Sequence, residues 1–490
     1  MKMTKIYLLL LPVLVIWGCG NFLEESSQDE IHPSQVTDLE QMLLGSAYEG
    51  CNFYACTDIF TDHYRSNGVT APLNQEAHDK IKWLYTWNEY MFTDEGAGYY
   101  SCFWERPYTL ILGCNLVLDN LDEVSGDDDL RESIRGEALV LRAWYYLHLV
   151  NFFGIAYNQG NPSENLGVPL KLESSVKIEY YSRNTVEEVY RQIEKDLLEG
   201  NRLLMKSNYH RDYFRMGHLA AKSILSRVYL YMEDWDKALA YADSVLLEKA
   251  DLLDLNGLEC RFSRSPSASV YQSTISNEII WAREMEDSEI DFNFSKTATI
   301  SPFTISHELI DSYAGATPED LALKTVVDLR GCFYFCGLSM VNNSYVERRE
   351  RVGKSYDPEY WGIRTAELYL NRAEAYAQKY VKEGNEMYRK AALDDLNHLR
   401  KYRYNHTYPY EEVNITDGRD LIEFCVEERW RELCGEANHR WCDIRRYGKS
   451  VTHILTEASG NTEYTKDMSR YALPIPKLIL EQNPSLIQNK

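Results

Sequence analysis

The sequence predicts a mostly α-helical protein, an α–α superhelix of tetratricopeptide-like helix pairs with an irregular insert that contains short strands. Three observations predict this fold class. Apolar residues recur at helical spacing along most of the chain, several segments carry the small-and-aromatic pattern of stacked helix pairs, and the periodicity fails between about residues 255 and 360. The chain has 490 residues, which is long enough for one large helical array.

The N-terminus carries an apolar run of about twelve residues that follows two lysines and ends at Trp17. A bilayer-spanning helix needs roughly 20 residues, so the run is typical of a signal peptide. Its end resembles a bacterial lipoprotein signal, in which residues 1–18 are removed and Cys19 is the lipidated residue. The acidic, Ser-rich residues 19–31 then form a flexible tether. The alternative is an ordinary secretory signal in which Cys19 has no special role.

Residues 185–198, "TVEEVYRQIEKDLL", show the helical spacing most clearly. One apolar stripe contains Val186, Val189, Tyr190, Ile193 and Leu197. Thr185 and Glu188 have the spacing of a capping box, which marks the start of a helix. Gly200 is expected to end this helix.

Residues 217–248 follow the tetratricopeptide pattern of a helix pair. The pattern places Leu225, Ser226 and Tyr229 on the first helix and Ala238 and Ala242 on the second. Glu233 and Asp234 form the turn. The small residues let the two helices approach closely, and the aromatic ring fills the groove between pairs.

Two further segments repeat this pattern. In residues 365–400 the pattern places Tyr369, Ala373 and Tyr376 on the first helix and Ala391 on the second. The turn near Glu383 carries about six extra residues. A weaker first helix spans residues 135–154, with Ala143 and Tyr146. Because one pair cannot bury its own apolar face, three or more pairs must stack.

The chain therefore divides into a helical part at 32–254 that carries the ligand loops, an irregular insert at 255–360, and a helical part with an extended tail at 361–490. Within the insert, "NEIIWA" and "CFYFC" are predicted as short β-like runs, and Trp281 as a core residue. Prolines in the C-terminal tail predict extended chain around one short helix.

The composition excludes several functions. The formal net charge of -23 argues against nucleic acid and anionic lipid as ligands. Cysteines are loosely grouped at 51/56, 332/336 and 425/434/442, but none has CxxC spacing, so most of the ten that follow Cys19 are predicted to be free and buried and not zinc ligands. We expect no metal and no cofactor. The 37 tyrosines and 10 tryptophans favour ligand contacts through half-exposed rings.

Two stretches, "WLYTWNEYMF" and "TDHYRSNG", are the candidate ligand-binding segments. The candidate residues are Asp62, Arg65, Asn67, Trp83, Tyr85, Trp87, Asn88 and Tyr90. If the first stretch is extended, Trp83, Tyr85 and Trp87 share one face. Sugar rings pack on such aromatic faces while amide and charged groups bond their hydroxyls. The alternative is that Trp83 and Trp87 are core residues.

Catalysis is not expected. The segment "VEERWREL" holds Glu427, Glu428 and Glu432, but arginines surround them, and nearby cations lower a carboxyl pKa and spoil it as a general acid. We predict a structural ion-pair network here. The chain also lacks the usual motifs of nucleophilic hydrolases, zinc proteases and phosphate-binding loops.

Six segments in order carry a resemblance to the SusD/RagB family, the surface glycan-binding lipoproteins of Bacteroidetes. The segments are "CGNFLEE", "FWERPYTLILGCNLVLDNLD", "RGEALVLRAWYYLHLVNFFG" with "NLGVPL", "ELYLNRAEAYA", "LIEFCVEERWRELCGEANHRWCDIRRYG" and "LPIPKLILEQNPSLIQN". The resemblance covers nearly the whole chain, although the insert matches poorly.

The resemblance implies a SusD-like fold and a non-enzymatic role. Such a protein is anchored by lipid to the outer membrane and faces the cell exterior. It captures an oligosaccharide or a peptide and delivers it to a SusC-like TonB-dependent transporter. Two alternatives stay open: a surface glycosidase, and a tetratricopeptide-like lid or scaffold that binds only its transporter.

Overall fold

A computed structural model gives the fold of the chain. It describes residues 33–48, 57–69, 72–93, 96, 101–177, 179–209, 212–258, 270–271, 276–282, 302–315, 325–335, 338–341, 344–347, 362–436 and 438–489. The predicted signal peptide, Cys19 and most of the tether lie outside these residues.

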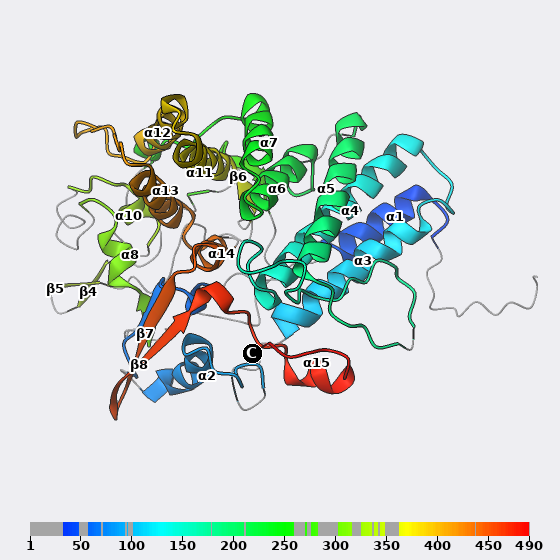
Figure 1. The fold of residues 1–490 in the computed structure, drawn as a ribbon, viewed down its shortest axis with the longest axis horizontal. Helices are drawn as coiled ribbons and strands as arrows, with labels where there is room; N and C mark the ends of the chain where they lie inside the picture. Colours follow the sequence, from blue (N-terminus) through cyan, green and yellow to red (C-terminus); the bar gives the residue numbers. More distant parts are fainter. Residues whose placement is uncertain are drawn as a thin grey trace, which may run out of the picture.

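Helices dominate the described residues, as the sequence predicts (Figure 1). The helices of the first half are α1 (Val36–Ser46), α2 (Gln75–Tyr85), α3 (Arg106–Asn120), α4 (Asp128–Phe153), α5 (Val186–Lys206), α6 (His218–Tyr231) and α7 (Trp235–Glu248). Those of the second half are α8 (His307–Asp311), α10 (Arg330–Phe333), α11 (Thr365–Glu383), α12 (Glu386–Lys401), α13 (Gly418–Leu433), α14 (His439–Arg446) and α15 (Lys477–Gln482). Single turns are η2 (Thr57–Phe60), η3 (Pro72–Asn74), η4 (Ser101–Glu105), η5 (Leu255–Gly257) and η6 (Met468–Arg470).

The long helices stack side by side in one array. α1 packs on α3, α3 on α4, α4 on α5, α5 on α6, and α6 on α7; α11 then joins α7 to α12 and α13. In Figure 1 the array runs from α1 at the right to α12 and α13 at the upper left. This arrangement confirms the predicted α–α superhelix.

The boundary between α4 and α5 corrects one prediction. The capping box of Thr185 and Glu188 does start α5, but the helix continues through Gly200 to Lys206. A Cβ atom at Gly200 would lie 2.7 Å from Val140 Cγ2 and 2.8 Å from the carbonyl oxygen of Gly136. The glycine therefore allows α4 and α5 to approach closely and is not a stop signal.

The pair α6–α7 forms as predicted. Leu225, Tyr229 and Ala242 are buried, and Ser226 Oγ donates a hydrogen bond to the Ala238 carbonyl oxygen across the pair at 3.1 Å. Asp234 caps α7 by accepting a hydrogen bond from the backbone N–H of Lys237 at 3.2 Å.

In the pair α11–α12 the turn is shorter than predicted. Gly384 ends α11 in the left-handed conformation, with φ of 68°, and Asn385 caps α12 directly. The extra residues lengthen α11 instead of expanding the loop.

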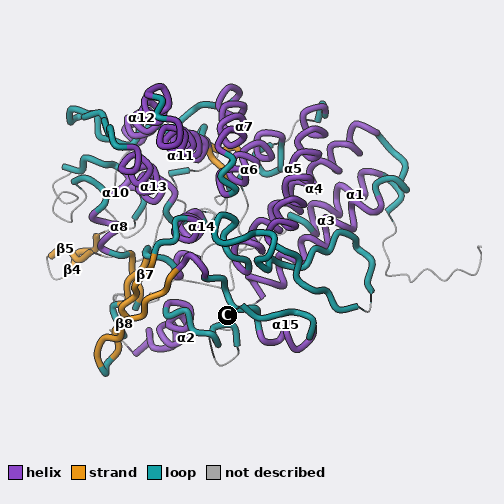
Figure 2. The backbone as a smooth tube through the Cα atoms, viewed as in Figure 1, coloured by secondary structure: helices purple, strands orange, loops and turns teal. Residues whose placement is uncertain are grey.

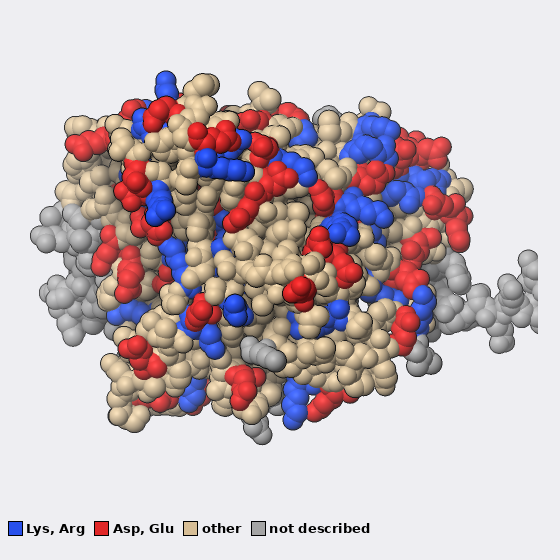
Figure 3. Space-filling view, viewed as in Figure 1, with Lys and Arg blue, Asp and Glu red and all other residues tan. Residues whose placement is uncertain are grey.

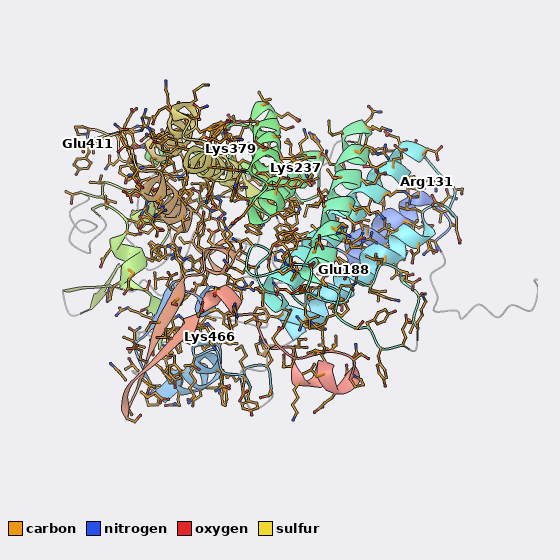
Figure 4. The ribbon with its side chains drawn as sticks, viewed as in Figure 1. Arg131, Glu188, Lys237, Lys379, Glu411 and Lys466 are labelled. Carbon is orange, nitrogen blue, oxygen red and sulfur yellow. The ribbon has the colours of Figure 1, made fainter. Side chains whose placement is uncertain are left out.

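Ion pairs join neighbouring helices at the surface (Figure 4). Lys379 on α11 pairs with Asp236 on α7, and Lys237 on α7 lies 3.5 Å from Glu194 Oε1 on α5. Exposed pairs of this kind contribute at most about 1 kcal/mol each. The array is therefore held mainly by its apolar contacts.

All the described strands pair in twos and antiparallel. They are β1 (Tyr64–Ser66) with β3 (Phe303–Ile305), β2 (Ile279–Trp281) with β6 (Ile363–Arg364), β4 (Leu338–Val341) with β5 (Ser344–Glu347), and β7 (Ser450–Glu457) with β8 (Gly460–Asp467). Figure 2 shows β7 and β8 at the lower left, apart from the helical array. This hairpin was not predicted from the sequence.

The insert matches its prediction in part. β2 forms within "NEIIWA", and Trp281 is buried. The prediction for "CFYFC" is wrong, because Arg330–Phe333 form the short helix α10. Cys332 in that helix is disulfide-bonded, against the expectation for most cysteines. The cysteines found free and buried are Cys114, Cys425, Cys434 and Cys442.

The tail adopts the predicted extended form around one short helix, α15. The C-terminus lies between α2 and α15 in Figure 1, near the helix that leads into the candidate aromatic stretch. Among the described helices, none is long and apolar enough to cross a membrane.

Candidate functional site

The candidate stretch 83–90 is not extended. α2 runs to Tyr85, because Ile81 and Leu84 lie on one helical face and are buried in the core. After the helix the chain turns sharply at Trp87, whose φ is 50°. The backbone N–H of Asn88 closes this turn by donating to the Trp83 carbonyl oxygen at 3.0 Å. The prediction that Trp83, Tyr85 and Trp87 share one strand face is therefore wrong.

Tyr85 and Trp87 are buried, with 2% and 5% of their surfaces exposed. Their rings enclose the imidazole of His453 on β7, at centroid distances of 4.0 Å and 4.1 Å. The indole N–H of Trp87 donates to the Phe60 carbonyl oxygen at 3.1 Å. Neither ring offers a face to solvent, so both are core residues that shape the turn, and the alternative considered for Trp87 is correct.

The other residues of the stretch lie nearer the surface. Trp83 is half-buried against the core, and Tyr90 is 57% exposed. Asn88 Oδ1 accepts a hydrogen bond from the backbone N–H of Tyr90 at 2.9 Å. Asn88 therefore positions Tyr90, and Tyr90 is the candidate ring that stands clear of the core.

The second candidate segment, 62–67, is largely occupied by structural contacts. The Asp62 carboxylate accepts two hydrogen bonds from Arg440, one from Nε at 2.8 Å. Although burial opposes ionisation, Arg440 holds the pKa of the Asp62 carboxyl below its usual value. Asn67 Nδ2 donates to Thr304 Oγ1 at 2.9 Å. Both side chains fix the loop to its neighbours.

Arg65 differs from these two. It lies on β1 opposite Thr304 of β3, and its Nε is buried without a hydrogen-bond partner in the described part of the chain. This N–H is a donor without an acceptor, but its burial keeps it out of reach of a ligand in solution.

A pocket of about 200 Å³ lies beside Tyr90. One wall consists of residues 89, 90, 92 and 93, and the other consists of the tail, with Pro474, Pro476 and Leu480. Lys477 lies at its edge, and Gln488 and Asn489 complete it. Tyr90 was among the predicted site residues, whereas the tail residues were not. The prolines of the tail marked it as extended chain, and nothing in their spacing shows what the chain lies against.

The tail wall is firmly held. Gln488 bonds both backbone groups of Ile475, at 2.7 Å and 2.8 Å. Asn489 Nδ2 donates to the carbonyl oxygens of Phe153 at 2.9 Å and Leu473 at 2.7 Å. Because these amides are engaged, the groups that a ligand can use are the Glu89 carboxylate, the Tyr90 hydroxyl and the Lys477 ammonium, which also lies 3.7 Å from Glu481 Oε1.

Charges of both signs surround this face of the molecule. Figure 3 shows Lys and Arg interspersed with Asp and Glu, with no large patch of one sign. In the described ranges no group of three or more His, Cys, Asp and Glu side chains is arranged to hold a metal ion.

The carboxylates considered for catalysis are engaged by arginines. Glu432 is fully buried and pairs with Arg330 at 3.0 Å, Arg364 at 2.6 Å and Arg403 at 3.0 Å. Burial opposes ionisation, but the arginines hold the pKa of Glu432 well below its usual range. The pKa of Glu428 is lowered in the same way. A carboxylate that stays ionised cannot act as a general acid, which agrees with the predicted ion-pair network.

Comparison with known proteins decides the family. Residues 21–230 match the model of a family described as starch-binding and associating with the outer membrane, and residues 337–490 match the model of the SusD family. The chain belongs to the SusD/RagB family. Its predicted membership is thereby confirmed.

Relatives of this SusD/RagB protein agree along most of its length. A protein named SusD-like protein P2, from Formosa agariphila, is 23% identical over 440 residues, which cover 82% of each chain. A solved structure of a putative sugar binding protein from Bacteroides vulgatus has a TM-score of 0.68 at 24% identity, over 94% of this chain and 99% of that one. A SusD-like carbohydrate binding protein from the same species has a TM-score of 0.64 at 21% identity, over 89% and 90%. These structures establish the shared fold.

Proposed function

We propose that this SusD/RagB protein is a lipid-anchored binding protein on the outer face of the outer membrane. It captures a neutral oligosaccharide and delivers it to a SusC-like TonB-dependent transporter, and it breaks no bond. Support comes from the family, whose description is starch binding at the outer membrane, and from relatives that are named as sugar-binding proteins.

The observation that carries the proposal is the exposed ring of Tyr90 at the edge of a pocket. The C–H face of a sugar packs on a flat aromatic ring, and its hydroxyls both donate and accept hydrogen bonds. Glu89 supplies an acceptor and Lys477 supplies donors beside that ring. The overall negative charge excludes polyanions but does not hinder a neutral ligand.

The other candidate residues take different parts in this proposal. Trp83 packs against the core, and the unpartnered Nε of Arg65 is buried, so neither residue belongs to the pocket beside Tyr90. Asp62 and Asn67 hold the loop that carries Arg65. Tyr85 and Trp87 act through the shape of the turn and touch no ligand.

The absence of catalysis in this proposal follows from the carboxylates. Glu428 and Glu432 are buried and neutralised by arginines, and Glu427, which is 48% exposed in its side chain, lies 3.8 Å from Arg431. Glu428 and Glu432 are buried and their pKa values are lowered, whereas a glycosidase acid needs access to the ligand and a raised pKa.

A scaffold that binds only the transporter is the second candidate. It is favoured by the burial of Tyr85 and Trp87, because two rings of the candidate stretch are then unable to contact a ligand. Under this alternative the helical array binds the transporter and the Tyr90 pocket has no ligand.

Two experiments test the proposal. Metabolic labelling with a fatty acid should mark the wild-type protein and not Cys19→Ala, and wild type should fractionate with the outer membrane. Purification from that membrane should recover a large barrel protein with the wild type. Unlabelled protein in the soluble fraction, without a barrel, would contradict the proposal. Titration with a panel of neutral oligosaccharides then distinguishes a protein that captures sugar from a scaffold that binds only the transporter.

A further inference from the structure

We infer that the pocket beside Tyr90 binds a single terminal pyranose unit, so that the protein recognises the end of a neutral oligosaccharide and not its middle. This inference rests on the proposed function and names the part of the ligand that this pocket selects. Three properties of the pocket carry it: its size, its polar groups and its rigidity.

The size of the pocket limits what it holds. Its volume is about 200 Å³, below the roughly 300–1,000 Å³ of pockets that enclose drug-sized ligands. One sugar ring is the matching unit. Phe92 and Ile475, with 4% and 1% of their surfaces exposed, form buried parts of the lining. A second ring of the same chain has no room within this volume.

The lining supplies the contacts that a neutral sugar needs. The Tyr90 ring is exposed for stacking, and Pro474, Pro476 and Leu480 face the pocket with apolar atoms. Among the lining residues Glu89 carries a negative charge and Lys477 a positive one, and Lys477 Nζ also lies 3.7 Å from Glu481 Oε1. A pocket with one charge of each sign gives neither an acidic nor a cationic sugar a net attraction, so a neutral sugar is not at a disadvantage.

The walls are fixed before a ligand binds. Asn88 holds the backbone at Tyr90, and Gln488 holds the backbone at Ile475. Arg183 donates to the carbonyl oxygen of Ile487 at 2.8 Å and to Asn489 Oδ1 at 2.9 Å, which ties the tail to the loop before α5. A pre-organised pocket loses little conformational entropy on binding, which favours affinity for one small unit.

Calorimetric titration of the mature chain tests this inference. The probes are linear neutral gluco-, galacto-, manno- and xylo-oligosaccharides, each as a trisaccharide and as a heptasaccharide. End recognition predicts the same affinity per molecule for both lengths of the sugar that binds. A groove along the chain predicts tighter binding of the longer probe, and that result would overturn the inference.

Variants locate the binding. Tyr90→Ala should weaken binding about tenfold or more, by analogy with the stacking of nucleic-acid bases on aromatic rings. Leu480→Trp should weaken it by filling the pocket. Tyr180→Ala is the matched control, because Tyr180 is 64% exposed and does not line the pocket; it should bind as wild type does. Thermal unfolding confirms that each variant is folded.

The outcomes separate the two proposals. If wild type binds a probe and both pocket variants bind it equally well, the pocket inference fails while carbohydrate capture stands. If wild type binds none of the neutral probes, both fail, and co-purification with the barrel then favours the scaffold.

Discussion

The imidazole ring of His453 lies face to face with the indole of Trp87, with centroids 4.1 Å apart and 13° between the planes. The Tyr85 ring covers the opposite face at 4.0 Å and 4°. His453 Nδ1 lies 2.5 Å from the Tyr85 carbonyl oxygen, and Nε2 lies 2.8 Å from that of Thr61. This stack ties the end of α2 to β7 and thereby fixes the turn that leads to Tyr90.

The first prediction concerns acid stability. Burial lowers the pKa of His453 to about 4, whereas in the unfolded chain it is about 6.5. Because the folded pKa is the lower one, the contribution of His453 is complete above about pH 6.5 and is lost as the pH falls toward 4. The loss should reach about 3 kcal/mol near pH 4, since one pKa unit corresponds to about 1.36 kcal/mol.

Urea unfolding of wild type and His453→Gln across this range measures that loss. The variant should be less stable at neutral pH, and the difference between the two proteins should shrink as the pH falls. A difference that stays constant with pH would show that His453 is not held neutral by the fold.

The second prediction concerns the contact between α4 and α5. Gly200→Ala should destabilise the protein by about 1–3 kcal/mol through overpacking against Val140, although alanine favours a helix by about 1 kcal/mol. Gly45→Ala is the control, because a Cβ atom at this exposed position of α1 meets nothing within 4 Å. Denaturant unfolding should show stabilisation or no change for Gly45→Ala; equal effects of the two substitutions would refute the close-packing account.

The third prediction concerns the buried end of α4. Arg445 donates to the carbonyl oxygens of Tyr471, Asn151 and Gly154, so it caps the helix and holds the tail. Burial lowers the pKa of Arg445 to about 10, but the guanidinium remains charged at neutral pH.

Arg445→Lys should destabilise the protein by on the order of 3 kcal/mol, because an ammonium cannot reproduce the planar fork of donors. Limited proteolysis should also cut the tail faster. Arg191→Lys, at a side chain 69% exposed beside Glu187, should change stability by less than about 0.5 kcal/mol. An intact tail and unchanged stability in Arg445→Lys would exclude the capping role.

The fourth prediction separates structure from catalysis. Glu432→Gln should lower the free energy of unfolding by about 3–5 kcal/mol, because three buried arginines then lose a negatively charged partner. Glu427→Gln, at the surface of the same helix, should leave stability within about 0.5 kcal/mol of wild type. Hydrolysis of a glycan by wild type that disappears in folded Glu427→Gln would instead support the glycosidase.

The helical array was predictable because local spacing determines it. The capping box at Thr185 and the small residues Ser226 and Ala238 specify where helices start and how closely they pack. Gly200 shows the limit of this reasoning: a glycine in the chain marks either a stop or a close approach, and only the position of Val140 on α4 decides which.

The candidate site was predictable only in part. Tyr90 is exposed as expected, but Trp87 is buried by His453, a residue more than 360 positions away in the chain. The hairpin that carries His453 did have a local signal, since Val451, His453 and Leu455 alternate with exposed residues before a Gly turn. The tail wall of the pocket had none, because its position depends on contacts with Arg183 and the end of α4.

The central claim is that the protein holds a neutral oligosaccharide at Tyr90 and releases it unchanged. Calorimetric titration of the mature chain with the oligosaccharide panel, followed by chromatography of the recovered sugar, tests it most directly. The account predicts saturable binding of micromolar or weaker affinity that Tyr90→Ala reduces, with the sugar recovered intact. Shortened sugar products, or no heat of binding with any probe, would contradict it.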